Sequence, residues 1–152
     1  MTEDAVYAAA LERFTAIIEE ARRLNLQDPT RVALATVSPA GQPSVRMVLM
    51  RGWDERGIRF FTNRNSRKGQ DLAANPRAGL CFHWEELQRQ IRIDGRVELA
   101  SDEESDAYWA QRPRESRIGA WASRQSEPLE MRQTLAERVA AFEARYPGED
   151  IP

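Results

Sequence analysis

The sequence predicts a mainly β protein with flanking helices, built on an antiparallel β-sheet or barrel. Five short apolar or alternating runs follow one another through the middle of the chain, which is the pattern of β-strands. Most connections between these runs are too short for the crossovers that parallel strands need. Helical patterns precede this region and follow it, so the sequence as a whole indicates an α+β fold.

The composition is that of a folded protein with one domain over residues 1–152. Of the 152 residues, 41% are hydrophobic and 30% are charged. The formal net charge of −2 offers no basic field, so we expect no nucleic-acid partner. No run approaches the ~20 apolar residues that cross a membrane, and the acidic N-terminus lacks the apolar core of a signal peptide. These features favour a cytoplasmic location.

Three residue types occur once each. Cys81 is the only cysteine, which excludes an internal disulfide and argues against a cysteine metal cluster. His83 is the only histidine, so a metal site or a His-dependent triad has little support, and we interpret His83 as structural. Cys81 is interpreted as a small core residue. Lys68 is the only lysine, so the other cations are arginines, which bind phosphate in bidentate geometry.

The N-terminal residues 3–25 have the periodicity of an amphipathic helix. The face that we expect to be apolar carries Tyr7, Leu11, Phe14, Ile18 and Leu24. Acidic residues near the start of this helix and arginines near its end suit the helix dipole.

The strands are expected at residues 32–37, 44–51, 58–62, 78–84 and 88–99. The second strand alternates, which places Arg46 on the face opposite Val45 and Met47. A turn over residues 52–57 leads to the third strand. A helix capped by Ser66 fills the gap before the fourth strand and stops at Pro76.

The last third of the chain is expected to be helical. Ser101 and Glu104 match a capping box, which begins a helix that runs to about Gln111. The segment 112–116 contains Pro113 and breaks this helix. A short helical turn near residues 118–123 and a longer helix over 126–146 follow.

Four cations form a candidate phosphate site. Arg46 and Arg51 belong to the second strand, and Arg67 and Lys68 open the helix that follows the third strand. Cations beside a helix N-terminus favour the binding of a phosphate, and Thr62 and Ser66 could add hydroxyl donors. Solvated charges at a sheet edge and ordinary turn chemistry are the alternative explanation.

Three amide and hydroxyl residues elsewhere are weaker candidates. Gln90 lies within the last strand, where an inward amide could bond the edge of a heteroaromatic ring. A surface glutamine is the simpler explanation of Gln90. Gln125 and Ser126 precede a helix, and N-capping explains them equally well.

A second phosphate site is suggested by Tyr108, Arg112 and Ser116. Their spacing of four residues would place them on one face of a continuous helix, although Pro113 interrupts it and the three could wrap around a loop. A phenol, a guanidinium and a hydroxyl in one place suit a phosphate. Core packing of Tyr108 and a surface charge at Arg112 are the alternative explanation.

Several segments together resemble the pyridoxamine 5'-phosphate oxidase family. They are RMVLMRGWDERGIRFFTNRNSRKGQDLAANPRAGLCFHW, RQIRIDGRVE and YWAQRPRESRIGAWASRQS, and the likeness covers about residues 30–126. The resemblance implies an antiparallel split β-barrel that binds FMN and works as a homodimer, with FMN in the interface. Four tryptophans, a generous number for the core of one small domain, also favour a homodimer.

The resemblance also implies roles for particular residues. Arg67 and Lys68 would hold the FMN phosphate. Arg51, which stands where the family typically has lysine, would contact both flavin and substrate. The substrate phosphate would be bound by Tyr108, Arg112 and Ser116. The residues that would border FMN are Arg46, Met47, Val48, Leu49, Met50, Arg51, Phe61, Thr62, Arg67, Lys68, Gln90, Gln125 and Ser126.

The sequence departs from the family pattern at two further points. Phe61 stands where a tyrosine is common. The sequence stops at Pro152, before a Trp-Gly-Gly segment and an Arg-x-His motif that family members usually carry. The family's C-terminal segment is therefore absent from this sequence, which is either part of a longer chain or a shortened relative.

The activity implied by the resemblance is the FMN-dependent oxidation of pyridoxamine or pyridoxine 5'-phosphate to pyridoxal 5'-phosphate, with oxygen as acceptor. A hydride equivalent would pass from the 4' carbon of the substrate to the flavin, and with pyridoxamine 5'-phosphate the resulting imine would hydrolyse to the aldehyde. No side chain is an obvious general base.

Two alternatives stay open. One is a flavin- or pyridoxal-phosphate-binding split-barrel protein without oxidase turnover, which the missing C-terminal motif favours. The other is a split-barrel reductase with a different substrate, whose cofactor could be a deazaflavin. Tyr108, Arg112 and Ser116 favour the oxidase over the reductase.

Overall fold

The computed structural model describes residues 2–152, which form two compact units. We call Met1–Phe61 with Asp71–Glu98 the sheet unit, and Thr62–Gln70 with Leu99–Pro152 the helical unit. The prediction of a single domain over residues 1–152 stays a prediction. Among residues 2–152, none of the helices combines the length and the apolar composition that a membrane crossing requires.

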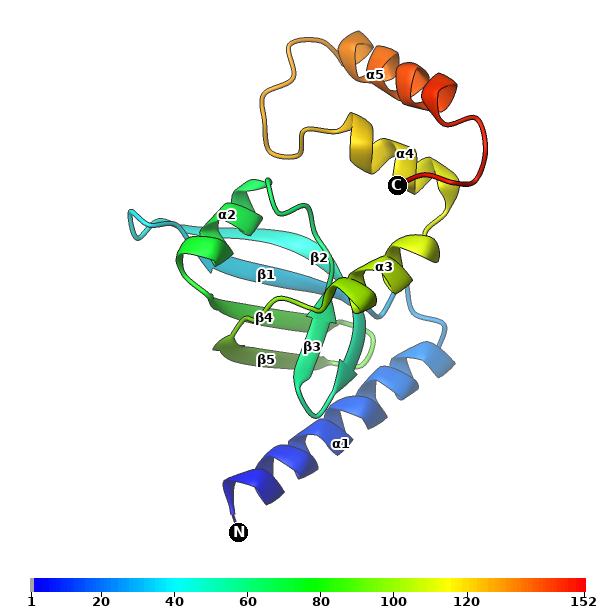
Figure 1. Cartoon of the computed structure of the whole chain (residues 1–152). Helices are drawn as coiled ribbons and strands as arrows, with labels where there is room; N and C mark the ends of the chain where they lie inside the picture. The colour runs from blue at the N-terminus through cyan, green and yellow to red at the C-terminus, as the bar shows by residue number, and fades with distance from the viewer. Residues whose placement is uncertain (1) are drawn as a thin grey trace. The chain divides into compact units, whose positions relative to one another are not determined.

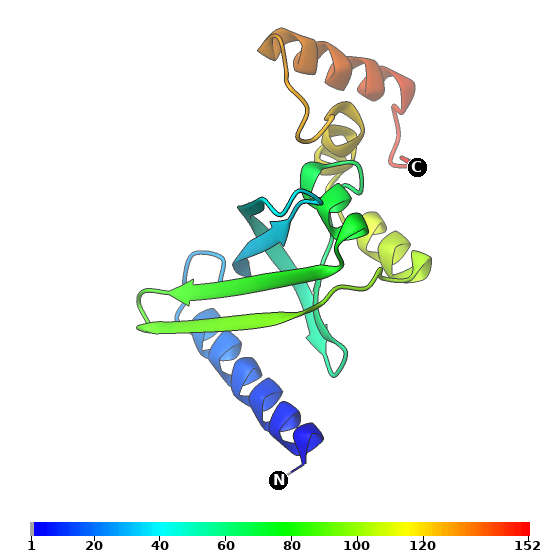
Figure 2. The same ribbon diagram turned by 90° about the vertical axis from the view of Figure 1, so that its left-hand side faces the viewer.

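The sheet unit contains one antiparallel sheet of five strands in the order β3-β2-β1-β4-β5. The sheet is curled rather than flat, as a sheet of the expected split β-barrel would be (Figures 1 and 2). All neighbouring strands are antiparallel, which confirms the predicted fold class. The strands are β1 (Arg31–Val37), β2 (Pro43–Asp54), β3 (Gly57–Phe60), β4 (Arg77–Trp84) and β5 (Arg89–Arg96).

The core of the sheet unit lies between the inner face of the sheet and helix α1 (Glu3–Arg23). Phe14 contacts Phe82 and Trp53 edge-on, with ring centroids 5.3 and 5.8 Å apart. The indole of Trp53 also donates a 2.8 Å hydrogen bond to the Thr15 hydroxyl, which satisfies the polar edge of a large apolar side chain. Aromatic packing and one hydrogen bond therefore fix α1 on the sheet.

The prediction that one face of α1 is apolar and buried is only partly confirmed. Phe14 and Ile18 are buried, but Tyr7 and Leu24 are 48% and 56% exposed. Periodicity shows which residues share a face, but the length of the sheet beneath the helix decides how many of them are covered.

Strand β2 extends further than predicted, through Trp53 to Asp54. The register shifts at Arg51, between the pairs Met50–Phe60 and Gly52–Arg59, and this bulge bends the long strand. The turn is confined to Asp54–Gly57. The Arg56 side chain and backbone N–H donate to the Asp54 carboxylate, which lowers the pKa of Asp54.

The alternation of β4 contradicts the interpretation of Cys81 as a core residue. Leu80, Phe82 and Trp84 face the core, whereas Cys81 is half-buried on the outer face. Cys81 is therefore not a core residue, because its position in the strand has the opposite parity. His83 is exposed on the same outer face as Cys81.

The helical unit contains α3 (Asp102–Ala110), α4 (Arg114–Ala122) and α5 (Arg132–Arg145). The predicted capping box at Ser101 and Glu104 is present. Helix α4 begins directly after Pro113, earlier than the predicted short turn, because proline suits a helix start, where its missing N–H leaves no partner unsatisfied. Helix α5 begins at Arg132, later than the predicted residue 126. Pro128 disfavours helical geometry in residue 127, which excludes a helix that is continuous from residue 126.

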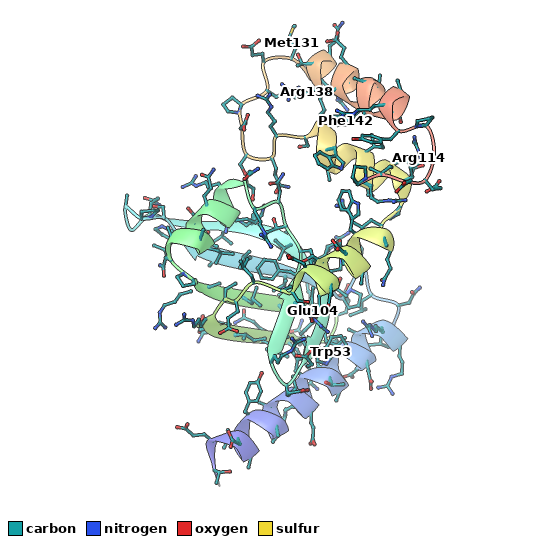
Figure 3. The ribbon with its side chains drawn as sticks, viewed as in Figure 1. Trp53, Glu104, Arg114, Met131, Arg138 and Phe142 are labelled. Atoms are coloured by element: carbon teal, nitrogen blue, oxygen red, sulfur yellow. The ribbon has the colours of Figure 1, made fainter. Side chains whose placement is uncertain are left out.

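Helices α4 and α5 pack against each other through aromatic rings. Phe142 of α5, which is labelled in Figure 3, stacks on Trp121 of α4 and on Tyr146, with centroids 6.1 and 6.4 Å apart. The buried residues of this unit include Ile118 at 0% and Ile151 at 3% exposure. Helix α2 (Arg67–Ala74) starts in the helical unit and ends in the sheet unit.

Candidate functional site

The predicted site residues of β2 face both sides of the sheet. Met50 is 2% exposed and packs in the core, and Val48 is half-buried against the same core. Met47 is 61% exposed on the outer face. Arg51 is exposed at the bulge. The stretch Arg46–Arg51 is therefore not a single ligand-facing surface, because strand residues alternate.

Arg46 is held by a buried polar network inside the sheet unit. Its Nη1 donates to the Thr36 hydroxyl at 2.8 Å and to the Leu34 carbonyl at 3.1 Å. The Thr36 hydroxyl donates in turn to the Asp71 carboxylate at 2.7 Å, and Arg46 Nη2 lies 3.9 Å from the same carboxylate oxygen. Thr36 and Asp71 are 1% and 4% exposed. This network fixes the guanidinium of Arg46, because a half-buried cation needs such partners.

Thr36 and Asp71 were not singled out by the sequence. Asp71 lies one helical turn after Arg67, which places an acid on a helix that opens with cations. That spacing is the sequence feature that could have indicated Asp71. Thr36 lies in an apolar strand, and its sequence context does not indicate a role in a polar network.

The start of α2 places Lys68 in a buried polar setting within the helical unit. The Lys68 ammonium donates to Gln125 Oε1 at 2.7 Å and to the Ser66 hydroxyl at 3.1 Å. Lys68 is 8% exposed and Ser66 is fully buried. Two residues predicted for the same site, 57 positions apart, are therefore in direct contact.

Ser66 also caps α2, as predicted. Its hydroxyl accepts from the Gly69 N–H at 3.4 Å and donates to the Asn63 carbonyl at 2.6 Å. A Cβ at Gly69 would overlap the Arg64 carbonyl, so the loop lies directly against the helix at this glycine. Arg67, beside Lys68, is exposed.

Gln125 and Ser126 lie in the loop between α4 and α5, not in a helix. Ser126 has φ of 73°, a left-handed conformation that is uncommon for a residue with a side chain. A cavity of about 230 Å³ lies at this loop. Arg138 of α5 points toward the loop (Figure 3). The lining residues are Ser123, Arg124, Gln125, Ser126, Glu127, Pro128, Leu129, Leu135 and Arg138.

Tyr108, Arg112 and Ser116 lie around the junction of α3 and α4. The Arg112 guanidinium carbon lies 6.0 Å from the centroid of the Tyr108 ring, and its Nη2 donates to the Ser116 carbonyl at 2.9 Å. Arg112 also lies 5.2 Å from the Trp109 ring centroid, a contact that the sequence did not suggest. The trio therefore forms one cationic cluster even though Pro113 separates the helices.

The remaining predicted residues lie at strand ends and on the outer face. Phe61 and Thr62 follow β3 and are half-buried. Gln90 is exposed on β5 and pairs with His83 across the ladder. Whether any of these residues contacts a ligand stays a prediction.

The family model described as pyridoxamine 5'-phosphate oxidase matches residues 17–146. A pyridoxine/pyridoxamine 5'-phosphate oxidase from Anaeromyxobacter dehalogenans is 54% identical over 142 residues, which cover 93% of this chain and 72% of the relative. The protein of the same name from Rubrobacter xylanophilus is 48% identical over 152 residues, which cover 100% of this chain and 70% of the relative.

Solved structures give a consistent result. PhzG from Burkholderia lata, in complex with tetrahydrophenazine-1-carboxylic acid, has a TM-score of 0.82 and 30% identity, and the match covers 91% of this chain and 67% of PhzG. A pyridoxamine 5'-phosphate oxidase-related, FMN binding protein from Nostoc punctiforme has a TM-score of 0.65 and 24% identity, over 80% of this chain and 69% of that one, and shows likeness of fold alone. The fold, the family model and the curated relatives agree, and the chain belongs to the pyridoxamine 5'-phosphate oxidase family of oxidoreductases.

Proposed function

We propose that this protein binds FMN and oxidises pyridoxamine or pyridoxine 5'-phosphate to pyridoxal 5'-phosphate, with oxygen as the electron acceptor. The observation that carries the proposal is the presence of two separate cationic clusters in the helical unit. Lys68 is held by Ser66 and Gln125, and Arg112 lies against Tyr108. Two anion sites suit a reaction in which both the cofactor and the substrate carry a phosphate.

The residues at the start of α2 fit the phosphate of FMN. Arg67 and Lys68 supply two cations in the first turn of a helix, where the helix dipole also favours an anion. Lys68 is pre-positioned by its two hydrogen bonds, which reduces the ordering cost of binding. FMN, when bound, supplies the hydride-accepting chemistry that no side chain can provide.

The substrate phosphate is assigned to Tyr108, Arg112 and Ser116. A guanidinium beside a phenol and a hydroxyl can form several charge-assisted hydrogen bonds to one phosphate. Arg46 and Arg51 of the sheet unit, together with Gln90, are assigned to the flavin, and Arg51 also to the substrate. The protein's part in the reaction is then to bind, orient and neutralise two anions, with no general base among the residues assigned.

We further infer that the working form is a homodimer. Val45 and Met47 are 65% and 61% exposed on the outer face of the sheet, although both are apolar. Neighbouring positions on this face are small, with Ala33 opposite Met47 and Ala35 opposite Val45. An apolar strip of a sheet with small neighbours is typical of a surface that another protein covers.

The test is the absorbance spectrum of the purified protein reconstituted with FMN. We expect a yellow protein that bleaches when pyridoxamine 5'-phosphate is added without oxygen, and that recovers its colour and yields pyridoxal 5'-phosphate when air is admitted. A yellow protein that never bleaches would instead support a binding module without turnover. A protein that binds no FMN would overturn the proposal.

The likeness to PhzG suggests a second candidate function, which the same experiment can test. It resembles this chain at a TM-score of 0.82 and holds a reduced phenazine carboxylic acid that has no phosphate. Oxidation of such a reduced heteroaromatic acid is the alternative. Bleaching by that acid, and not by pyridoxamine 5'-phosphate, would favour it.

A further inference from the structure

The segment 146–152, which we call the strap, is held in the helical unit by side chains of α3 and α4. Arg114 is seen beside it in Figure 3. The main-chain oxygens of the strap accept the hydrogen bonds. These run from Trp109 Nε1 to Ile151 (3.0 Å), from Arg114 Nε to Gly148 (3.1 Å), from Arg114 Nη2 to Tyr146 (2.6 Å), from Arg117 Nη1 to Glu149 (2.9 Å) and from Trp121 Nε1 to Pro152 (2.6 Å).

Burial and charge strengthen the attachment of the strap. Ile151 is 3% exposed, so its side chain is part of the core of the helical unit. Arg117 also forms an ion pair with the Glu149 carboxylate at 3.1 Å. The strap is fixed by five main-chain hydrogen bonds and one buried side chain, so it limits the motion of the tryptophan and arginine side chains that donate to it.

Of these donors, Trp109 alone also touches the predicted substrate cluster, among the contacts of the described residues. One end of its indole donates to the Ile151 carbonyl, and its ring lies 5.2 Å from the guanidinium carbon of Arg112. The ring of Tyr108 lies 6.0 Å from the same carbon. Arg112 is therefore flanked by two aromatic rings, one of which the strap holds in place.

Arg112 keeps most of its hydrogen-bonding capacity in this arrangement. Within residues 2–152, its one hydrogen bond to protein runs from Nη2 to the Ser116 carbonyl at 2.9 Å. A guanidinium has five N–H donors. Because its direction is fixed and most of its N–H groups are still available, the Arg112 guanidinium is well placed to bind an anion.

We propose that Trp109 is a positioning residue for Arg112. The hydrogen bond to Ile151 fixes the indole, and the indole face fixes the guanidinium in the orientation that meets the substrate phosphate. The proposal rests on the assignment of Arg112 to that phosphate. Its physical basis is preorganisation, because a restrained arginine loses less side-chain freedom when the anion binds.

The chain offers a matched control. Trp121 also donates its indole N–H to the strap, but its ring stacks on Phe142 and not on Arg112. Trp109→Phe and Trp121→Phe therefore each remove one indole donor to the strap and keep an aromatic ring. Trp109→Leu additionally removes the ring that faces Arg112.

The experiment measures pyridoxal 5'-phosphate and FMN binding by titration of each variant of the full chain. We expect Trp109→Leu to weaken pyridoxal 5'-phosphate binding roughly 3- to 30-fold, the range of a cation–π contact, and Trp109→Phe to weaken it less. FMN affinity should stay within about twofold of the wild type in both, because Trp109 is not among the residues assigned to the flavin. Trp121→Phe should leave pyridoxal 5'-phosphate affinity unchanged. Equal losses in Trp121→Phe and Trp109→Phe, or no loss in Trp109→Leu, would overturn the proposal.

A second measurement separates this proposal from the proposed function. The Arg112 Nε–H signal, assigned by its loss in Arg112→Lys, reports guanidinium mobility through NMR relaxation. We expect an ordered guanidinium in the wild type and in Trp121→Phe, and a mobile one in Trp109→Leu. If the wild type does not bind pyridoxal 5'-phosphate, the substrate assignment fails, and the relaxation data still decide whether Trp109 positions Arg112. Equal mobility in all variants would contradict the positioning role.

Discussion

At the scale of single residues, the two cationic clusters are held by different means. Lys68 is buried and bonded to a hydroxyl and an amide oxygen, whereas its neighbour Arg67 is exposed. Arg112 is held by aromatic faces and one carbonyl. Since the clusters share no residue, single substitutions can separate the binding of the two phosphates.

Arg67→Ala should weaken FMN binding. The loss of one charge-assisted contact, about 1.5–3 kcal/mol, corresponds to roughly 10- to 150-fold in the dissociation constant. Arg64→Ala, which removes an exposed arginine from the loop that precedes α2, is the control and should leave FMN affinity nearly unchanged. A fluorescence titration with FMN checks both variants. Unchanged affinity in Arg67→Ala would refute the assignment.

Arg112→Ala should have the reverse selectivity. Flavin content should be nearly intact, whereas pyridoxal 5'-phosphate binding should weaken by about 2 kcal/mol, roughly 30-fold. Paired titrations of the same protein with each ligand check this. If FMN weakens and pyridoxal 5'-phosphate does not, the two sites have been assigned the wrong way round. If neither changes, Arg112 is a surface charge without a ligand.

At the scale of elements, one buried network joins β1, β2 and α2. Thr36 of β1 bonds both Arg46 of β2 and Asp71 of α2. The network holds the C-terminal part of α2 on the sheet, and in the same helix the first turn carries Arg67 and Lys68. A polar network of this kind is costly to leave half-satisfied.

Asp71→Asn should therefore destabilise the fold. Removing the carboxylate charge leaves Arg46 with weaker compensation, and we expect a loss of about 1–3 kcal/mol in the free energy of unfolding, the range for an impaired buried hydrogen bond to a charged group. Asp94→Asn, at an exposed acid on β5, is the control and should cost less than about 0.5 kcal/mol. Urea denaturation measures both. Equal effects would show that the network contributes little.

At the scale of the whole molecule, a single copy of the chain does not explain why apolar side chains are exposed on the outer face of the sheet. Its apolar side chains Val45 and Met47 are exposed, and the small residues Ala33 and Ala35 lie beside them in the neighbouring strand. A second copy of the chain would bury this strip. Stable interfaces bury on the order of 800 Å² per partner, so neighbouring strands would have to take part.

Met47→Glu should convert the homodimer to monomers, because burying an unpaired carboxylate in an interface costs several kcal/mol. Light scattering should give twice the chain mass of 17.4 kDa for the wild type and a single chain mass for the variant. Val6→Glu, at an apolar residue of α1 that is 48% exposed, is the control and should remain dimeric. A monomeric wild type with FMN bound would contradict the dimer.

Local signals predicted most of the fold. Alternation placed the strands, the Ser101 capping box began α3, and Ser66 capped α2 as expected. The boundaries that differed depend on pairing with other strands, as in the extension of β2 to Asp54, or on turn geometry, as at Ser126. Spacing and resemblance also named Lys68, Gln125, Tyr108 and Arg112 as site residues.

The sequence by itself determined the family, the antiparallel fold class and the residue types that can meet a phosphate, because these depend on local pattern and residue chemistry. Tertiary structure decided which of those residues have partners. It joined Lys68 to Gln125 across 57 positions and supplied Asp71 to Arg46. It also placed Trp109 between Arg112 and the strap. Such contacts join residues far apart in the chain, and only the packing of whole elements brings them together.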